Sequence, residues 1–96
     1  MLILVVGRHP EIMARVRALL EGAGFRTVSA LTDDEAIRQM REASPGALLL
    51  GGGVEETSRA QLAETFRAAL PGRIVITHFG GPHGLVEHVR AAIASA

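Results

Sequence analysis

The stretch Leu2–Pro10 reads Leu-Ile-Leu-Val-Val-Gly-Arg-His-Pro: five apolar residues, a turn, and then the start of a new segment. Five consecutive apolar residues are typical of a parallel strand that is covered on both faces. We therefore expect 2–6 to be a central strand of a sheet, with helices on either side.

The same order, a strand and then a helix, occurs four times along the chain. Thr32 with Glu35 forms a capping box, Gly22 and Gly24 stop the preceding helix, and Pro71-Gly72 ends a later one. The expected strands are 2–6, 25–30, 47–50 and 74–77, and the expected helices cover about 11–22, 32–44, the region of 62–70, and 83–95. This alternation predicts one α/β domain, 1–96, with a parallel sheet between two helical layers.

The helices each show apolar residues at helical spacing, which predicts the faces that pack on the sheet. Two acidic pairs, Asp33-Asp34 and Glu55-Glu56, lie near helix starts, where they complement the helix dipole, and Ser58 with Gln61 reads as a helix cap. The expected inward residues are Ile12, Val16, Leu19 and Leu20; Ala36, Ile37 and Met40; Leu62, Phe66, Ala69 and Leu70; and Leu85, Val86, Val89, Ala92 and Ile93.

Composition excludes several classes of function. The chain has 96 residues, ten basic against ten acidic, and no cysteine, so neither a disulfide framework nor a thiolate site is available. Zero net charge argues against nucleic-acid and acidic-membrane partners. All ten basic residues are Arg, which excludes lysine chemistry. No stretch is long enough to span a membrane and no secretory leader is evident, so we expect a cytoplasmic protein.

About half of the chain resembles the receiver domain of two-component response regulators. The resemblance rests on the first strand, on Pro10-Glu11-Ile12 and the helix to Leu20, on Glu21–Phe25, on Ala30–Ala36, and on the strands before Gly51 and Thr77. It implies a flavodoxin-like fold with strand order 2-1-3-4 and two helices on each face. The chain passes directly from its fourth strand to the equivalent of the family's last helix, which implies a shortened receiver.

The departures from the family concern its chemistry. Where the family has two metal-binding acids this chain has Gly7 and Arg8, and where it has the phosphorylated Asp this chain has Gly51. Receiver chemistry needs a carboxylate nucleophile and oxygen ligands for Mg²⁺. The resemblance therefore implies a pseudo-receiver: a signalling or regulatory interaction module that is not an enzyme, needs no cofactor and is not phosphorylated by the receiver mechanism.

Two alternatives stay open at the carboxyl ends of the strands, where ligands of such sheets bind. One is a small-anion or nucleotide sensor that uses backbone N–H groups beside an Arg. The other is a metal enzyme in which His9, His78 and His83 bind the ion together with Glu55 and Glu56. The histidines at 78, 83 and 88 are five residues apart, however, and do not share a helical face. The candidate anion-binding residues are Arg8, Gly51, Gly52, Gly53, Thr77, Gly80 and Gly81.

The fourth strand indicates an assembly. In the order 2-1-3-4 it lies at the edge of the sheet, although Ile74-Val75-Ile76 has the composition of an interior strand. Exposed apolar edges pair with other chains unless something blocks them. We expect a homodimer, or an unknown protein partner, bound through Arg73, Ile74, Val75, Ile76 and Phe79, with Phe66, Phe79 or Leu85 adding apolar contacts between helices.

Overall fold

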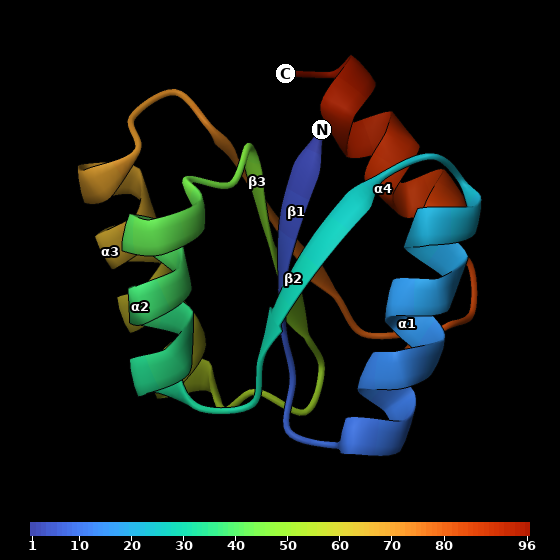
Figure 1. Ribbon diagram of the computed structural model, residues 1–96, viewed down its shortest axis with the longest axis horizontal. Helices are drawn as coiled ribbons and strands as arrows, with labels where there is room; N and C mark the ends of the chain where they lie inside the picture. The colour runs from blue at the N-terminus through green and yellow to red at the C-terminus, as the bar shows by residue number, and fades with distance from the viewer.

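The computed structural model describes all 96 residues and alternates four strands with four helices (Figure 1). Both the number of elements and their order are those predicted from the sequence. The elements are β1 (Leu2–Val6), α1 (Pro10–Gly22), β2 (Arg26–Ala30), α2 (Asp33–Ala43), β3 (Ala47–Gly51), α3 (Glu56–Ala69), β4 (Ile74–His78) and α4 (Leu85–Ala94).

The four strands form one parallel sheet in the order β2-β1-β3-β4, which confirms the predicted fold class. Figure 1 shows the sheet nearly edge-on, with α2 and α3 on one face and α1 and α4 on the other. The chain passes from β4 through the loop 79–84 directly into α4. The last helix, α4, packs beside α1 on the same face of the sheet, as predicted.

Local sequence explains where the elements begin and end. The Thr32 side chain accepts a hydrogen bond from the Glu35 backbone N–H at 3.2 Å, so the predicted cap at the start of α2 is present. Ser44 ends α2 in the left-handed conformation, with φ of 49°, and Pro45 follows. Pro10 occupies the first turn of α1, where its missing N–H costs nothing.

The sheet divides the interior into two apolar cores. Because side chains alternate along a strand, Ile3 and Val5 face α1 and α4, whereas Leu4 and Val6 face α2 and α3. The first core also contains Met13, Val16, Leu20, Ala47, Leu49, Ile76, Leu85 and Val89, and the second contains Ala30, Ala36, Met40, Leu48, Leu50, Val54, Leu62 and Phe66.

Several side chains predicted to face inward do not. α1 meets the sheet through a narrow stripe of Met13, Val16 and Leu20, so Ile12 and Leu19 lie to its sides and are 43% and 41% exposed. In α3 and α4, Ala69 is exposed and Val86 is only half-buried. Periodicity gives the centre of a helical face, but contact with the strands and the neighbouring helix sets its width.

Two further predictions about local structure and contacts are wrong. α3 begins earlier than its apolar residues indicate, with Glu55 as the N-cap, and Ser58 instead donates to Asp33. Phe66 and Leu85, predicted to contribute to an interface between chains, are 0% and 1% exposed inside this one. Phe79 is 70% exposed and remains available to a partner. None of the four helices has the length and apolar character of a membrane-spanning segment.

Candidate functional site

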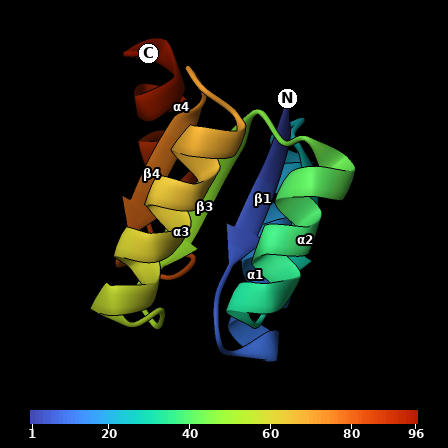
Figure 2. The same cartoon turned by 90° about the vertical axis from the view of Figure 1, so that its left-hand side faces the viewer.

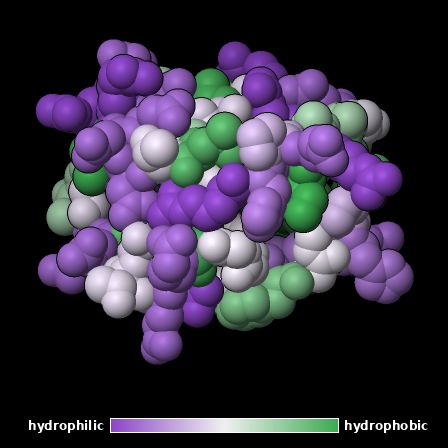
Figure 3. Space-filling view, turned by 90° about the horizontal axis from the view of Figure 1, so that it is seen from below, coloured by the Kyte–Doolittle hydropathy of each residue, from purple (hydrophilic) through white to green (hydrophobic).

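The loops that follow β1, β3 and β4 meet at one end of the sheet, the lower end in Figure 1. The chain order reverses between β1 and β3, so this end is a topological switch point, where ligands of open parallel sheets bind. Figure 3 views the molecule from this end and shows white and green surface among purple, hydrophilic side chains. The seven predicted anion-binding residues all lie in or next to these loops.

Arg8 connects three of the loops at this end. Its Nη2 lies 2.6 Å from Asp33 Oδ1, at the start of α2, and 3.1 Å from Glu55 Oε2, just before α3. Its Nη1 donates to the Leu31 backbone oxygen at 3.0 Å. Ser58 donates to the other oxygen of Asp33 at 2.7 Å. All three guanidinium nitrogens therefore have partners, because Nε donates to Glu55 Oε1 at 3.4 Å.

These contacts shift the pKa values of the three charged groups and stabilise their charged forms. Hydrogen bonds from Arg8 and then from Ser58 lower the pKa of Asp33, and the hydrogen bond from Arg8 lowers the pKa of Glu55. The same contacts, first with Glu55 and then with Asp33, raise the pKa of Arg8. One cation thus faces two carboxylates. Anion binding at these loops stays a prediction, and Arg8 does not bring a free positive charge to it.

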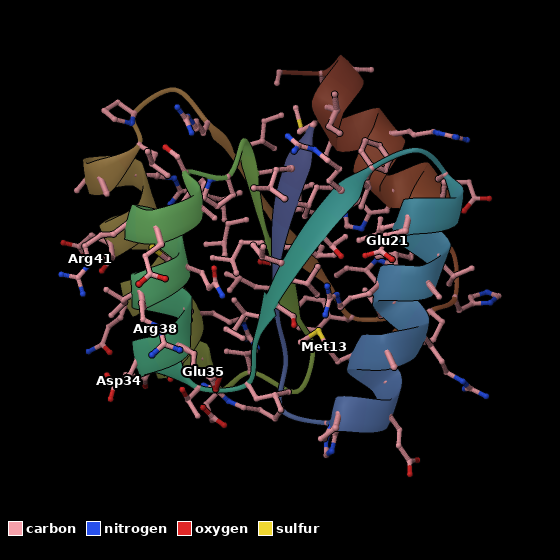
Figure 4. All side chains as sticks on the ribbon, in the orientation of Figure 1. Met13, Glu21, Asp34, Glu35, Arg38 and Arg41 are labelled. Carbon is pink, nitrogen blue, oxygen red and sulfur yellow. The ribbon has the colours of Figure 1, made fainter.

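A cavity of about 250 Å³ opens between α1, the loop 79–84 and the ends of β1 and β3. Figure 4 shows Met13 directed from α1 toward the sheet at this level. The half-exposed Ile12 also lines the cavity, which gives that side chain a place in the candidate site. The remaining lining residues are Val5, Val6, Gly7, Arg8, His9, Val16, Leu49, Gly51, Gly52, Gly53, His78, Phe79, Gly81 and Leu85.

The glycines at the cavity allow neighbouring loops to approach closely. A Cβ at Gly51 would lie 3.3 Å from the Val6 backbone oxygen, and one at Gly52 would lie 3.3 Å from Phe79. A Cβ at Gly80 would meet the His83 backbone oxygen at 2.9 Å, closer than real contacts come. Packing therefore requires glycine at position 80 and favours it at positions 51 and 52, whether or not a ligand binds.

Comparison with solved structures finds the N-terminal domain of a response regulator receiver protein from Methanoculleus marisnigri JR1. The two chains share 18% sequence identity and superpose with a TM-score of 0.57 over 97% of this chain and 96% of the other. The chain has the receiver fold. No protein-family model matches it, and no curated protein matches it.

In this receiver fold the histidines pair across elements rather than along a helix. His78 Nδ1, at the end of β4, lies 2.8 Å from His88 Nδ1 on α4, and His78 Nε2 lies 3.0 Å from the His83 backbone oxygen. A carbonyl oxygen only accepts, so His78 Nε2 is the donor to His83, whereas the roles of the two Nδ1 atoms depend on the tautomers of the rings. No group of three His, Asp or Glu side chains is arranged to hold a metal ion.

The sequence places Arg8 in the site but does not predict that Asp33 and Glu55 bind it. Asp33 and Glu55 read as residues that complement helix dipoles, and both do lie at helix starts. A signal was present: each follows the carboxyl end of a strand, and such ends meet at one edge of a parallel sheet. Only the folded chain shows that Arg8 reaches both carboxylates.

The Arg8–Asp33 pair predicts a dependence of stability on acid pH. Because the folded pKa of Asp33 lies below its ordinary value of about 4, the pair stabilises the protein above that value and ceases to do so as pH falls through the folded pKa. The Asp33 side chain is 34% exposed, so we expect at most about 1 kcal/mol. Urea unfolding of the protein and of Asp33→Asn, at about pH 6 and about pH 2, measures it. The difference between the two proteins should shrink in acid, and an unchanged difference would contradict the prediction.

Proposed function

We propose that this chain is a signalling or regulatory interaction module with the receiver fold, that it carries out no catalysis, and that the receiver mechanism does not phosphorylate it. The support begins with residue types. By the resemblance, the phosphoacceptor position is held by Gly51 and the two metal-binding positions by Gly7 and Arg8. Glycine has no side-chain oxygen with which to attack a phosphoryl group or to bind Mg²⁺.

The observation that carries the proposal is the position of the Arg8 guanidinium. It extends from the end of β1 into the loops where the family would bind its cation, and it is held there by Asp33 and Glu55. A divalent cation at this place would have to compete with a fixed positive charge for the same two carboxylates. Arg8 thus links its own loop to the loops that carry Asp33 and Glu55. A bound metal ion could link the same loops, but only while it is bound.

Packing around position 51 supports the same conclusion. The Val6 backbone oxygen lies where it would press on any Cβ at Gly51, and Gly51 pairs in register with His78 of β4. Position 51 has no carboxylate, and the close Val6 oxygen makes the site tight for any residue larger than glycine. A receiver-like domain without these reactive groups can still bind other molecules through its surface. We therefore infer an interaction role.

The proposal is tested with a small phosphodonor. Incubation with Mg²⁺ and acetyl phosphate should leave the mass of the intact protein unchanged, because neither a nucleophile nor a metal site of the receiver type is available. A receiver domain that has all its acids, treated in parallel, is the control and should gain a phosphoryl group that hydroxylamine removes. Stoichiometric, hydroxylamine-labile phosphate on an Asp or Glu of this chain would overturn the proposal.

A further inference from the structure

The two edges of the sheet are not alike, and β2 is the protected one. Along β2 the backbone groups of Thr27 and Ser29 point away from β1, because Arg26 and Ala30 bond to the β1 side. Arg17 of α1 covers this edge: its Nη2 donates to the Thr27 backbone oxygen at 3.4 Å, and its Nε donates to Thr27 Oγ1 at 3.0 Å.

Two further contacts complete this cover. Arg17 Nη1 donates to Ser29 Oγ at 3.2 Å, and Thr27 Oγ1 donates to Glu21 Oε2 at 2.5 Å. Figure 4 shows Glu21 on the side of α1 that faces β2. A charged side chain laid along an edge is one of the ways in which proteins prevent strand addition. A new strand could pair with β2 only by displacing Arg17.

At the other edge, β4 has no such cover. The Ile74 backbone N–H bonds to the Gly46 oxygen toward β3, so by alternation the N–H and C=O groups of Val75 and Thr77 point outward. No side chain bonds to these outward groups. Figure 2 shows β4 as the outermost strand, with α3 and α4 over its faces and no element beyond it.

Arg73, the charged residue at the start of this edge, is turned away from it. Arg73 Nη1 donates to the Ser44 and Pro45 backbone oxygens at 2.8 and 3.0 Å, in the turn before β3. The strand has no bulge, since its register with β3 is continuous from Ile74 to His78. Phe79, 70% exposed, directly follows it, with the Arg59 guanidinium carbon 5.1 Å from the centre of its ring.

We propose that β4 pairs antiparallel with β4 of a second copy of this chain, about a two-fold axis beside Ile76, to form a continuous sheet of eight strands. The proposal rests on the proposed function, because it names the partner of that interaction module. Val75 of one copy and Thr77 of the other then face each other and exchange two hydrogen bonds, and the symmetric pair exchanges two more.

The outward backbone groups of β4 would accept any extended strand, and a second copy is favoured because it also places Arg73 opposite the exposed Phe79 and carries no net charge. An identical strand satisfies all four groups of each copy's Val75 and Thr77 in a single register. Arg73 of one copy then lies opposite Phe79 of the other, which brings the exposed ring into the interface. The chain has zero net charge, so two copies do not repel each other at long range.

The test combines assembly with matched proline substitutions. Val75→Pro removes an outward N–H of β4 and no bond to β3, whereas Ser29→Pro removes an outward N–H of the protected β2 edge. Light scattering over a dilution series should give a dimer for the wild-type protein and for Ser29→Pro. For Val75→Pro the dimer should dissociate at a concentration at least about tenfold higher than for wild type, because two interchain bonds are lost per dimer.

Hydrogen exchange of the wild-type protein makes the test independent of how the variants fold. The Val75 and Thr77 amides should exchange more slowly as protein concentration rises, while the Thr27 and Ser29 amides should not change. A wild-type monomer at hundreds of micromolar, or a dimer whose Val75 and Thr77 amides exchange at a rate independent of concentration, would overturn the proposal. Neither result affects the outcome of the acetyl phosphate experiment. The proposed function and the proposed dimer can therefore fail independently of each other.

Discussion

Val89→Asp is expected to unfold most of the protein under conditions in which the wild type is folded. Val89 is 0% exposed, on the face of α4 that packs with Leu85 into the core shared with α1. No basic side chain belongs to this core. An ionised carboxylate there has no partner, and a neutral one still lacks hydrogen bonds, so we expect a loss of about 3–5 kcal/mol. The total free energy of unfolding of a domain of this size is only about 5–15 kcal/mol.

The measurement is the free energy of unfolding from urea titration followed by circular dichroism. Ala91→Asp is the matched control, because Ala91 is exposed on the same helix and the same charge there should cost no more than about 1 kcal/mol. An unchanged midpoint for Val89→Asp would mean that α4 leaves this face of the sheet in solution.

Phe66→Ala is expected to cost a similar amount on the opposite face. Phe66 is 0% exposed and is the largest fully buried side chain, in the core that α2 and α3 form against the sheet. Its removal takes away the buried area of a ring and leaves a cavity that the surrounding leucines fill only in part. Substitutions of this kind cost about 3–5 kcal/mol.

The chain offers a control of the same residue type. Phe79 is 70% exposed, so Phe79→Ala should change the free energy of unfolding of the monomer by no more than about 0.5 kcal/mol. The two variants should therefore separate clearly in urea unfolding at a concentration where the protein is monomeric. Equal effects would contradict the assignment of Phe66 to the core.

Much of the fold was predictable because its signals are local. The apolar runs of β1 and β3 mark them as central strands, and the Thr32 cap and the turn at Ser44-Pro45 mark both ends of α2. The placement of α4 beside α1 was also predictable, since α2 and α3 together cover one face of four strands and leave room on the other.

The errors have a common cause. Ile12 and Leu19 are apolar and correctly spaced, but only contact with the strands and with α4 decides how wide the buried stripe of α1 is. The spacing of Ser58 and Gln61 predicts a helix cap. In the structure the Ser58 hydroxyl instead donates to Asp33, which is 25 residues away along the chain. A side chain with two possible partners takes the one that the fold brings closer.

Residue type and short-range periodicity were enough to predict the parallel sheet, the two layers of helices and the absence of a carboxylate at positions 7, 8 and 51. The folded chain was needed to see that Arg8 binds Asp33 and Glu55, that His78 meets His88, and that Arg17 covers the β2 edge while β4 stays open. Each of these contacts joins segments that are distant along the chain or belong to different elements. Such contacts depend on the directions in which the loops leave the sheet. Local patterns of residues in the sequence do not predict those directions.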